Sequence, residues 1–353
     1  MTILITGAAG FVGSCISQYF REHYSNVNII GIDNLSRRGS ENNIVRLVEM
    51  GCKFYHGDIR NKEDIDDLPK ADWIIDCAAN PSVLAGLDGG SLGLVNNNLT
   101  GTINLLEKCK RDFAGFIMLS TSRVYSIHQL SNIPIEENHF TFSIKKDASY
   151  PSGFSESGVS EKFSTQSPVS LYGATKLASE IMALEYHHTF GFPVWINRCG
   201  VIAGPGQFGK IDQGVFSFWV YQYLLNKPLS FIGFGGSGKQ ARDFFHPFDL
   251  FNLIHKQIMS SEKSASKILN VGGGVKNTWS LLQLDSFCKK AIDKDKEVKQ
   301  VAENRSFDIP LYISDYSLAE KEWDWQPALS AEDIMLQIVK YGYENLEYLK
   351  RIG

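Results

Sequence analysis

Long hydrophobic runs are absent from this chain of 353 residues, and no apolar stretch approaches the roughly 18 residues that a membrane span requires. The start of the chain does not resemble a signal peptide either, because Met1 leads directly into a short apolar run at residues 3–5. We therefore expect a cytoplasmic protein that has no membrane partner.

Blocks of charge of one sign are also missing. The 35 basic and 39 acidic residues give a net charge of −4 and are spread along the chain. This distribution offers no electrostatic footprint for nucleic acid, so the expected partner is a small molecule. The six cysteines form no CxxC pair, and the eight histidines form no HExxH motif. We expect reduced, mostly buried cysteines and no metal site.

Hydrophobic residues are plentiful, at 43%, which is enough for the cores of two domains. Short apolar runs occur at residues 2–6, 27–33, 53–57, 73–77 and 116–120, and amphipathic segments separate them. This alternation predicts βαβ units around a parallel sheet. The predicted fold class is therefore α/β, with a Rossmann-type, doubly wound parallel sheet and a smaller, discontinuous α/β domain that binds the substrate.

We assign the Rossmann domain to residues 1–195 plus about 246–278, and the smaller domain to about 196–245 plus 279–353. Between residues 126 and 170 the periodic pattern breaks into Ser, Thr, Pro and charged residues. This stretch is too long for an ordinary connection. We expect it to be a lid, a substrate loop or a mobile segment.

The first predicted strand runs into TGAAGFVG, which places Gly7, Gly10 and Gly13 where a strand meets a helix. Glycine at these positions permits a tight turn and leaves helix N-terminal amides free to bind a pyrophosphate. Asp33 ends the second strand about 20 residues after Gly13, the spacing typical of a carboxylate that binds the adenosine ribose. The three features together predict a dinucleotide site.

Asp33 would repel a 2′-phosphate, which favours NAD over NADP. Arg37 and Arg38 are the competing signal because they could neutralise such a phosphate, but we interpret them as solvated loop charges. Asp58 follows the third strand, where it either reaches the adenine edge or simply forms a turn. Ala78, after the fourth strand, is expected to pass beneath the cofactor.

The sequence YGATK places Tyr172 and Lys176 four residues apart in a predicted helix, and hence on one face. A nearby ammonium stabilises a phenolate and lowers the tyrosine pKa from about 10 toward the working pH. We expect Tyr172 to act as general base on a substrate hydroxyl while a hydride leaves the same carbon for nicotinamide. The fifth strand ends in STSRVY, where the hydroxyl of Thr121 or Ser122 can hold the reacting oxygen.

TGAAGFVG, Asp33-Asn34, STSRVY and YGATK together resemble the extended short-chain dehydrogenase/reductase family, specifically its nucleotide-sugar epimerases and dehydratases. The resemblance spans nearly the whole chain and implies a catalytic triad of Thr121, Tyr172 and Lys176. The cofactor contacts that we expect in addition to the glycines, Asp33, Asp58 and Ala78 are those of Phe11, Val12, Asn34, Ile59, Tyr172 and Lys176.

The second half of the chain narrows this resemblance. NRCGVIAGPGQFGKIDQGVFSFW and GFGGSGKQARDFFH are similar to segments of the CDP-paratose 2-epimerases of the family. The resemblance implies transient oxidation of a CDP-hexose at C2, with hydride return from NAD to the opposite face. The substrate contacts that we expect are those of Ser122, Arg123, Asn197, Arg242 and Arg305.

Other activities stay open at this point. The family's dehydratases carry an Asp-Glu pair where this chain has Ser122-Arg123, which argues against dehydration. Its 4-epimerases usually continue the strand arginine with Tyr-Phe-Asn, whereas Cys199, Gly200 and Val201 follow the arginine here. A nucleotide-sugar reductase or dehydrogenase and an NAD-sensing protein without turnover are the further alternatives. The family resemblance also implies a homodimer or homotetramer.

Overall fold

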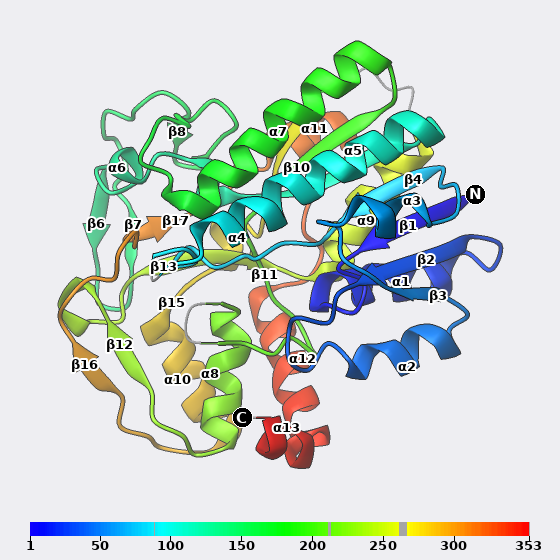
Figure 1. Ribbon diagram of the computed structural model, residues 1–353. Helices are drawn as coiled ribbons and strands as arrows, with labels where there is room; N and C mark the ends of the chain where they lie inside the picture. The colour runs from blue at the N-terminus through cyan, green and yellow to red at the C-terminus, as the bar shows by residue number, and fades with distance from the viewer. Residues whose placement is uncertain (88, 211–212, 261–266, 353) are drawn as a thin grey trace.

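A seven-stranded parallel sheet forms the centre of the molecule, with strand order β14-β10-β5-β4-β1-β2-β3 (Figure 1). The computed structural model describes residues 1–87, 89–210, 213–260 and 267–352. The strands of the sheet are β1 (Thr2–Thr6), β2 (Asn28–Asp33), β3 (Lys53–His56), β4 (Trp73–Asp76), β5 (Gly115–Thr121), β10 (Val194–Cys199) and β14 (Ile268–Val271). The chain runs outward from β1 to β3 and then crosses to β4, which creates a topological switch point beside β1. This arrangement confirms the predicted Rossmann-type fold.

Helices cover both faces of the sheet, which explains why its strands are continuous apolar runs rather than alternating ones. One face packs against α1 (Phe11–His23), α2 (Asn42–Glu49), α9 (Pro247–Met259) and α11 (Ser317–Trp323). The other face packs against α3 (Lys62–Asp66), α5 (Gly101–Asp112) and α7 (Ser170–Phe190). Neighbouring residues of β1 serve the two cores in turn, with Ile3 and Ile5 on one side and Leu4 on the other.

A second core lies beside the carboxyl ends of the sheet strands. It is built mainly on three helices: α8 (Val215–Leu224), α10 (Leu281–Ile292) and α12 (Ala331–Glu344). Smaller sheets join it, formed by β11 (Val201–Ile202), β12 (Ser230–Ile232), β13 (Ala241–Phe245), β15 (Thr278–Ser280), β16 (Lys299–Val301) and β17 (Leu311–Tyr312). The two-domain division stays a prediction. Helix α11 and Trp325, which we predicted in the smaller domain, pack against the parallel sheet.

The segment 126–170 is folded and packed. It contains α6 (Ile127–Leu130), β6 (Ile135–Glu137), β7 (Phe142–Ile144), β8 (Phe154–Ser155) and β9 (Gly158–Val159). Its buried side chains share a core with residues of β13 and β17, and the amide of Val159 donates to the carbonyl of Ile313 at 2.8 Å. The segment therefore packs against the small strands that adjoin the second core.

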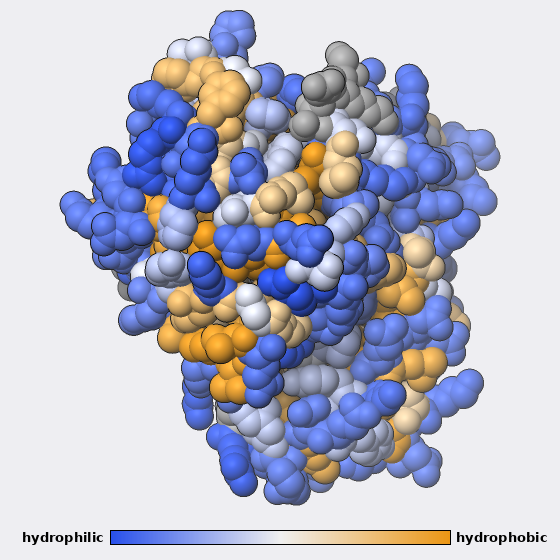
Figure 2. All heavy atoms as spheres, turned by 90° about the vertical axis from the view of Figure 1, so that its right-hand side faces the viewer, coloured by the Kyte–Doolittle hydropathy of each residue, from blue (hydrophilic) through white to orange (hydrophobic). Residues whose placement is uncertain are grey.

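Short elements complete the fold. They are α4 (Ser91–Val95), the π-helix η1 (Asn96–Thr100), the 3-10 turns η2 (Ser122–Val124), η3 (Phe234–Gly236) and η4 (Val275–Asn277), and α13 (Leu346–Ile352). None of the helices within the described ranges combines the length and apolar composition that a membrane crossing requires. Figure 2 shows one face on which hydrophilic residues separate the apolar ones into groups.

Candidate active site and cofactor cradle

The three predicted glycines form a cradle between β1 and α1. A Cβ atom on Gly13 would lie 2.2 Å from the carbonyl oxygen of Gly7, so only glycine lets the helix approach the turn this closely. Gly7 itself has a φ of +58°. Gly10 is the N-cap of α1 and provides no side-chain cap, which leaves the first amides of the helix, those of Phe11 and Val12, free of a side-chain acceptor. The cradle therefore fits the pyrophosphate of a dinucleotide.

Asp33 lies at the carboxyl end of β2, beside this cradle. Its Oδ2 accepts a hydrogen bond from the amide of Ala9 at 3.0 Å, and its Oδ1 accepts one from the amide of Leu35 at 2.8 Å. Burial raises the pKa of Asp33, and these backbone donors oppose the shift. The carboxylate is thus held in place next to the glycine turn, where the predicted ribose contact requires it.

Asn34 and Asp58, both assigned to the cofactor site, contact each other. The Asn34 side-chain amide donates to Oδ2 of Asp58 at 2.9 Å. Arg60, which the sequence analysis missed, donates from Nε to Oδ1 of Asp58 at 2.9 Å and lowers the pKa of this carboxyl to about 2. Ile59 is buried and faces Gly101 of α5, so its side chain packs inward.

In the loop after β2, the prediction for Arg37 was wrong. We expected Arg37 and Arg38 to be solvated charges, and Arg38 is exposed. Arg37 is half-buried, and its Nη2 donates to the carbonyl of Phe208 at 2.9 Å while its Nη1 donates to Oε1 of Gln213. The Arg37 guanidinium therefore links the loop after β2 to Phe208 and Gln213, and these hydrogen bonds compete with binding of a 2′-phosphate. Ala78 borders the cradle, since a Cβ atom on Gly7 would lie 3.0 Å from its Cα.

The predicted catalytic side chains gather at the carboxyl end of β5. Oγ1 of Thr121 accepts a hydrogen bond from the amide of Arg123 at 3.2 Å, which caps η2. Helix α7 approaches this turn so closely that a Cβ atom on Gly173 would lie 2.2 Å from the Arg123 carbonyl oxygen. Tyr172 and Lys176 of α7 are both buried. The close approach brings the helix that carries the base to the strand end that carries the hydroxyl.

The electrostatics of Tyr172 differ from the expectation. Burial raises its pKa to about 12, and hydrogen bonding to Thr121 and the charge of Arg123 act in the lowering direction. Lys176 lies within electrostatic range of the Cys77 and Cys199 thiols, whose pKa values burial raises. Arg123 is therefore a cation near the phenol in addition to Lys176, which lies one turn along the same helix. All six cysteines are free, as expected.

A buried ion pair that the sequence analysis missed lies behind these groups. Nη2 of Arg198 donates to Oε2 of Glu180 at 2.6 Å, and its Nε donates to Oε1 at 3.0 Å. The Ser120 hydroxyl donates to the same carboxylate. Glu180 lies on α7 and Arg198 on β10, so their separation in the sequence offered no signal for this pair. The pair fixes α7 against β5 and β10, and so fixes Tyr172 relative to Thr121.

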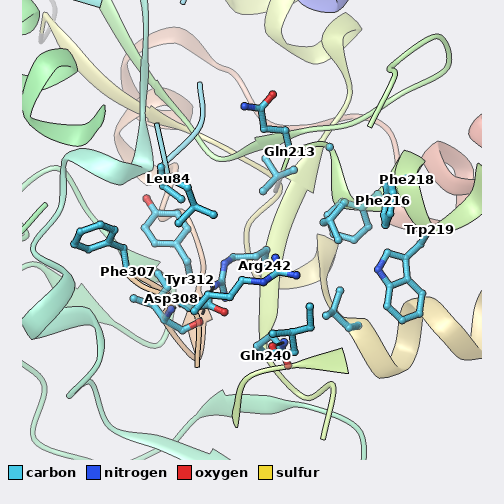
Figure 3. Close-up of a pocket in the computed structure, with 18 of the residues that line it drawn as sticks. Leu84, Gln213, Phe216, Phe218, Trp219, Gln240, Arg242, Phe307, Asp308 and Tyr312 are labelled. Carbon is cyan, nitrogen blue, oxygen red and sulfur yellow. Dashed lines mark hydrogen bonds and ion pairs between the residues drawn. The ribbon is translucent and has the colours of Figure 1, made fainter. Parts of the chain in front are cut away.

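A pocket of about 270 Å³ opens next to the catalytic residues and extends toward the second core (Figure 3). Four of the five predicted substrate residues line it, namely Ser122, Arg123, Arg242 and Arg305. Nη2 of Arg242 donates to Oδ1 of Asp308 at 2.8 Å, and burial lowers the arginine pKa to about 10. Figure 3 shows Arg242 between Asp308 and Tyr312 on one side and the aromatic ring of Trp219 on the other.

Asn197, the fifth predicted substrate residue, lies elsewhere. Its side chain is fully buried in β10, where its Nδ2 donates to Oε1 of Gln257 at 3.0 Å and its Oδ1 accepts from Nε2 of Gln257 at 2.9 Å. It does not line the pocket, because strand side chains alternate and this one points toward α9. Among the described residues, no three His, Cys, Asp or Glu side chains are grouped to hold a metal ion.

Comparisons with known proteins find nucleotide-sugar epimerases that match nearly the whole chain. CDP-paratose 2-epimerase of Salmonella typhi is 29% identical over 344 residues, which cover 94% of this chain and 96% of that protein. UDP-glucuronate 4-epimerase of Thermodesulfobacterium geofontis is also 29% identical, over 99% of this chain and 98% of that protein. The structure of UDP-glucuronic acid 4-epimerase from Bacillus cereus, in complex with UDP-glucuronic acid and NAD, matches with a TM-score of 0.76 and 26% identity, covering 98% of this chain and 99% of that one.

The sequence profile of the family described as "NAD dependent epimerase/dehydratase family" matches residues 3–272, which include the glycine cradle, Thr121 and the YGATK helix. The family and the solved NAD complexes agree with the cradle in assigning NAD as the cofactor. The chain is thus an enzyme of the NAD-dependent epimerase/dehydratase family, the nucleotide-sugar branch of the extended short-chain dehydrogenases/reductases.

Proposed function

We propose that this enzyme is a nucleotide-sugar 2-epimerase that converts CDP-paratose to CDP-tyvelose. The observation that carries the proposal is the pocket wall next to the catalytic centre, where Val201 stands at the position that a 4-epimerase fills with asparagine. The Salmonella typhi relative that is named a CDP-paratose 2-epimerase supports the same substrate. Ser122-Arg123 in place of an acidic pair removes the acid and base that elimination of water would need.

The order of side chains along the pocket supports a nucleoside diphosphate sugar. Arg242 lies in the middle of the pocket, and guanidinium groups suit the bidentate recognition of phosphate. Trp219 and Trp279 belong to the second core and also line the pocket, and flat rings pack well against a base. Ser122 lines the part of the pocket next to Thr121. A sugar bound there would lie beside the catalytic residues. In this arrangement Arg242 and Arg305 bind the diphosphate.

The chain's own groups then move one proton. In its phenolate form, Tyr172 accepts the proton of the C2 hydroxyl, while the Thr121 hydroxyl holds the same oxygen. NAD held by the glycine cradle would supply the redox chemistry, as acceptor and donor of the C2 hydride. The 2-keto sugar presents its other face before reduction, and Tyr172 then returns the proton to the C2 oxygen. The cycle leaves the cofactor unchanged.

Proton NMR in deuterated water tests the proposal. Purified enzyme without added NAD is incubated with CDP-paratose, and the sugar H1 and H2 signals are followed. Conversion to the manno isomer without deuterium at C2 supports internal hydride return. Deuterium at C2 would show proton abstraction from carbon instead, and no conversion would reject this substrate.

The base should be essential in the same assay. Tyr172→Phe is expected to retain NAD and to lose about 10²- to 10⁴-fold in rate, because general base catalysis contributes about that much. Full activity of this variant would reject the role of Tyr172. The expected assembly is a homodimer or homotetramer.

A second candidate is 4-epimerisation of a UDP-uronate. The observation that favours it is the 29% identity to UDP-glucuronate 4-epimerase across 99% of the chain. Incubation with UDP-glucuronate, followed by the same NMR signals at C4, distinguishes the two. A net reductase or dehydrogenase would instead change the nicotinamide absorbance in proportion to product.

A further inference from the structure

The segment before β17 carries a phenylalanine in an unusual backbone conformation. Phe307 has a φ of +62°, in the left-handed region that glycine favours and that a bulky side chain rarely adopts. Other residues that the structure describes share such a φ, Phe113 among them, but Phe307 is the one of this group that lines the pocket. A bulky side chain held in this conformation at a binding site indicates a function for that side chain.

Hydrogen bonds place Phe307 near the catalytic end of the pocket. The Arg123 amide donates to Oγ1 of Thr121 at 3.2 Å, and Nη1 of the same arginine donates to the Phe307 carbonyl oxygen at 3.3 Å. The residue after Phe307, Asp308, is ion-paired with Arg242 at 2.8 Å. Phe307 therefore lies between the strand end that carries Thr121 and the arginine that we assign to the diphosphate. The sugar of a nucleotide sugar would occupy this part of the pocket.

Apolar side chains accompany the Phe307 ring in the pocket lining. Leu84, from the segment after β4, also lines the pocket, and Figure 3 shows it on the same side of Arg242 as Phe307, with Trp219 on the other side. A sugar hydroxyl that faced these apolar groups would lose hydrogen bonds to water without regaining them, whereas a methyl or methylene group would gain from the contact. A carboxylate that approached Arg123 would compete with the Phe307 carbonyl oxygen for it.

We propose that Phe307 is a specificity-determining residue, whose ring selects nucleotide sugars that lack hydroxyl groups on the part of the sugar that faces it. This inference rests on the proposed function, because it places the sugar in the part of the pocket beside Thr121. It adds the class of sugar, which is a deoxyhexose and not a fully hydroxylated hexose or a uronate. Paratose belongs to this class because it has no hydroxyl group at C3 or C6, and glucose is its hydroxylated counterpart.

Binding to the NAD-loaded protein tests the proposal. Calorimetry gives the dissociation constants of CDP-paratose and CDP-glucose, which carry the same nucleotide, in a Tyr172→Phe background that prevents turnover. With Phe307 present, CDP-paratose should bind about 10- to 100-fold more tightly, the discrimination that an apolar wall achieves against an added hydroxyl group. Phe307→Gly should lower this ratio about tenfold, mainly by weakening the binding of CDP-paratose. Phe307→Leu keeps an apolar side chain and should keep most of the ratio.

Phe113→Gly is the matched control. Phe113 has a φ of +55°, but it follows α5, is 69% exposed and does not line the pocket. Both glycine variants replace a phenylalanine by the residue that adopts this conformation without strain, so a general effect of backbone relief would appear in both. The binding ratio should stay unchanged in Phe113→Gly. An equal change in the two variants would overturn the proposal, and so would an unchanged ratio in Phe307→Gly.

UDP sugars keep this inference separate from the proposed function. UDP-6-deoxyglucose and UDP-glucose differ by one hydroxyl group, and their binding ratio does not depend on recognition of cytosine. The deoxy sugar should bind more tightly in this pair as well, and Phe307→Gly should reduce its advantage. If the wild-type enzyme does not convert CDP-paratose, the proposed function fails, and these ratios still decide the role of Phe307. Tighter binding of UDP-glucuronate than of either deoxy sugar would overturn that role, because the pocket would then accept a uronate beside the Phe307 ring.

Discussion

Gly13→Ala should separate α1 from the cofactor turn. The new Cβ atom would lie 2.2 Å from the Gly7 carbonyl oxygen, 2.8 Å from the Gly7 carbonyl carbon and 2.9 Å from Cα of Ala8, all backbone atoms that cannot rotate away. Ordinary contact begins near 3.4 Å, so the helix must retreat by about 1 Å. Overpacking of this kind costs typically about 1–3 kcal/mol, and the gain in helix propensity of about 1 kcal/mol offsets only part of it.

The retreat should also weaken NAD binding, because the amides of Phe11 and Val12 move with the helix. A loss of about 1.4 kcal/mol of binding free energy corresponds to a tenfold weaker Kd, and we expect at least that. The assays are NAD retained through purification and the urea midpoint. Gly93→Ala is the control: no heavy atom lies within 4 Å of its added Cβ, so it should keep NAD and gain up to about 1 kcal/mol. Equal behaviour of the two variants would refute the reasoning.

Three further changes test other parts of the structure. Asp33→Ala should weaken NAD and reduce the preference against NADP, measured as the two dissociation constants; unchanged values would place the ribose contact elsewhere. Glu180→Ala should destabilise the protein by about 3–5 kcal/mol, because it leaves the Arg198 guanidinium buried and unpaired, and Arg198→Met in the same chain should recover part of the loss in urea unfolding. Burial lowers the pKa of His246 to about 4. As the pH falls, this side chain therefore takes up a proton in the unfolded chain before it does so in the folded chain, and the free energy of unfolding should decrease by about 2 kcal/mol from pH 7 to pH 5. His246→Asn should reduce this dependence of the free energy of unfolding on pH.

Features that lie within one strand and the following helix were predictable from the sequence. Gly7, Gly10 and Gly13 belong to one β1–α1 unit, so their spacing alone determines the shape of the cradle. Tyr172 and Lys176 lie one turn apart on α7, so the helix period places them on one face. The five sheet strands β1 to β5 were recognisable because short apolar runs alternate with amphipathic segments in the first third of the chain.

Features that depend on contacts between distant segments were not predictable. Arg37 was expected in solvent, but its partners Phe208 and Gln213 come from a loop that packs on it only in the folded chain. Asn197 was assigned from its place in a motif. The strand it occupies pairs with β5 on one side and β14 on the other, and that pairing turns its side chain toward Gln257. A motif gives residue order but not which face of a strand is covered.

The same distinction applies to the reactivity of Tyr172. The spacing of YGATK identifies the group that moves the proton, because it requires only one helix. The pH at which that group ionises depends on burial beneath other elements, on the Thr121 hydroxyl at the end of β5, and on the charge of Arg123 in η2. Each of these comes from a different part of the chain. Two enzymes with identical YxxxK helices can therefore differ in working pH.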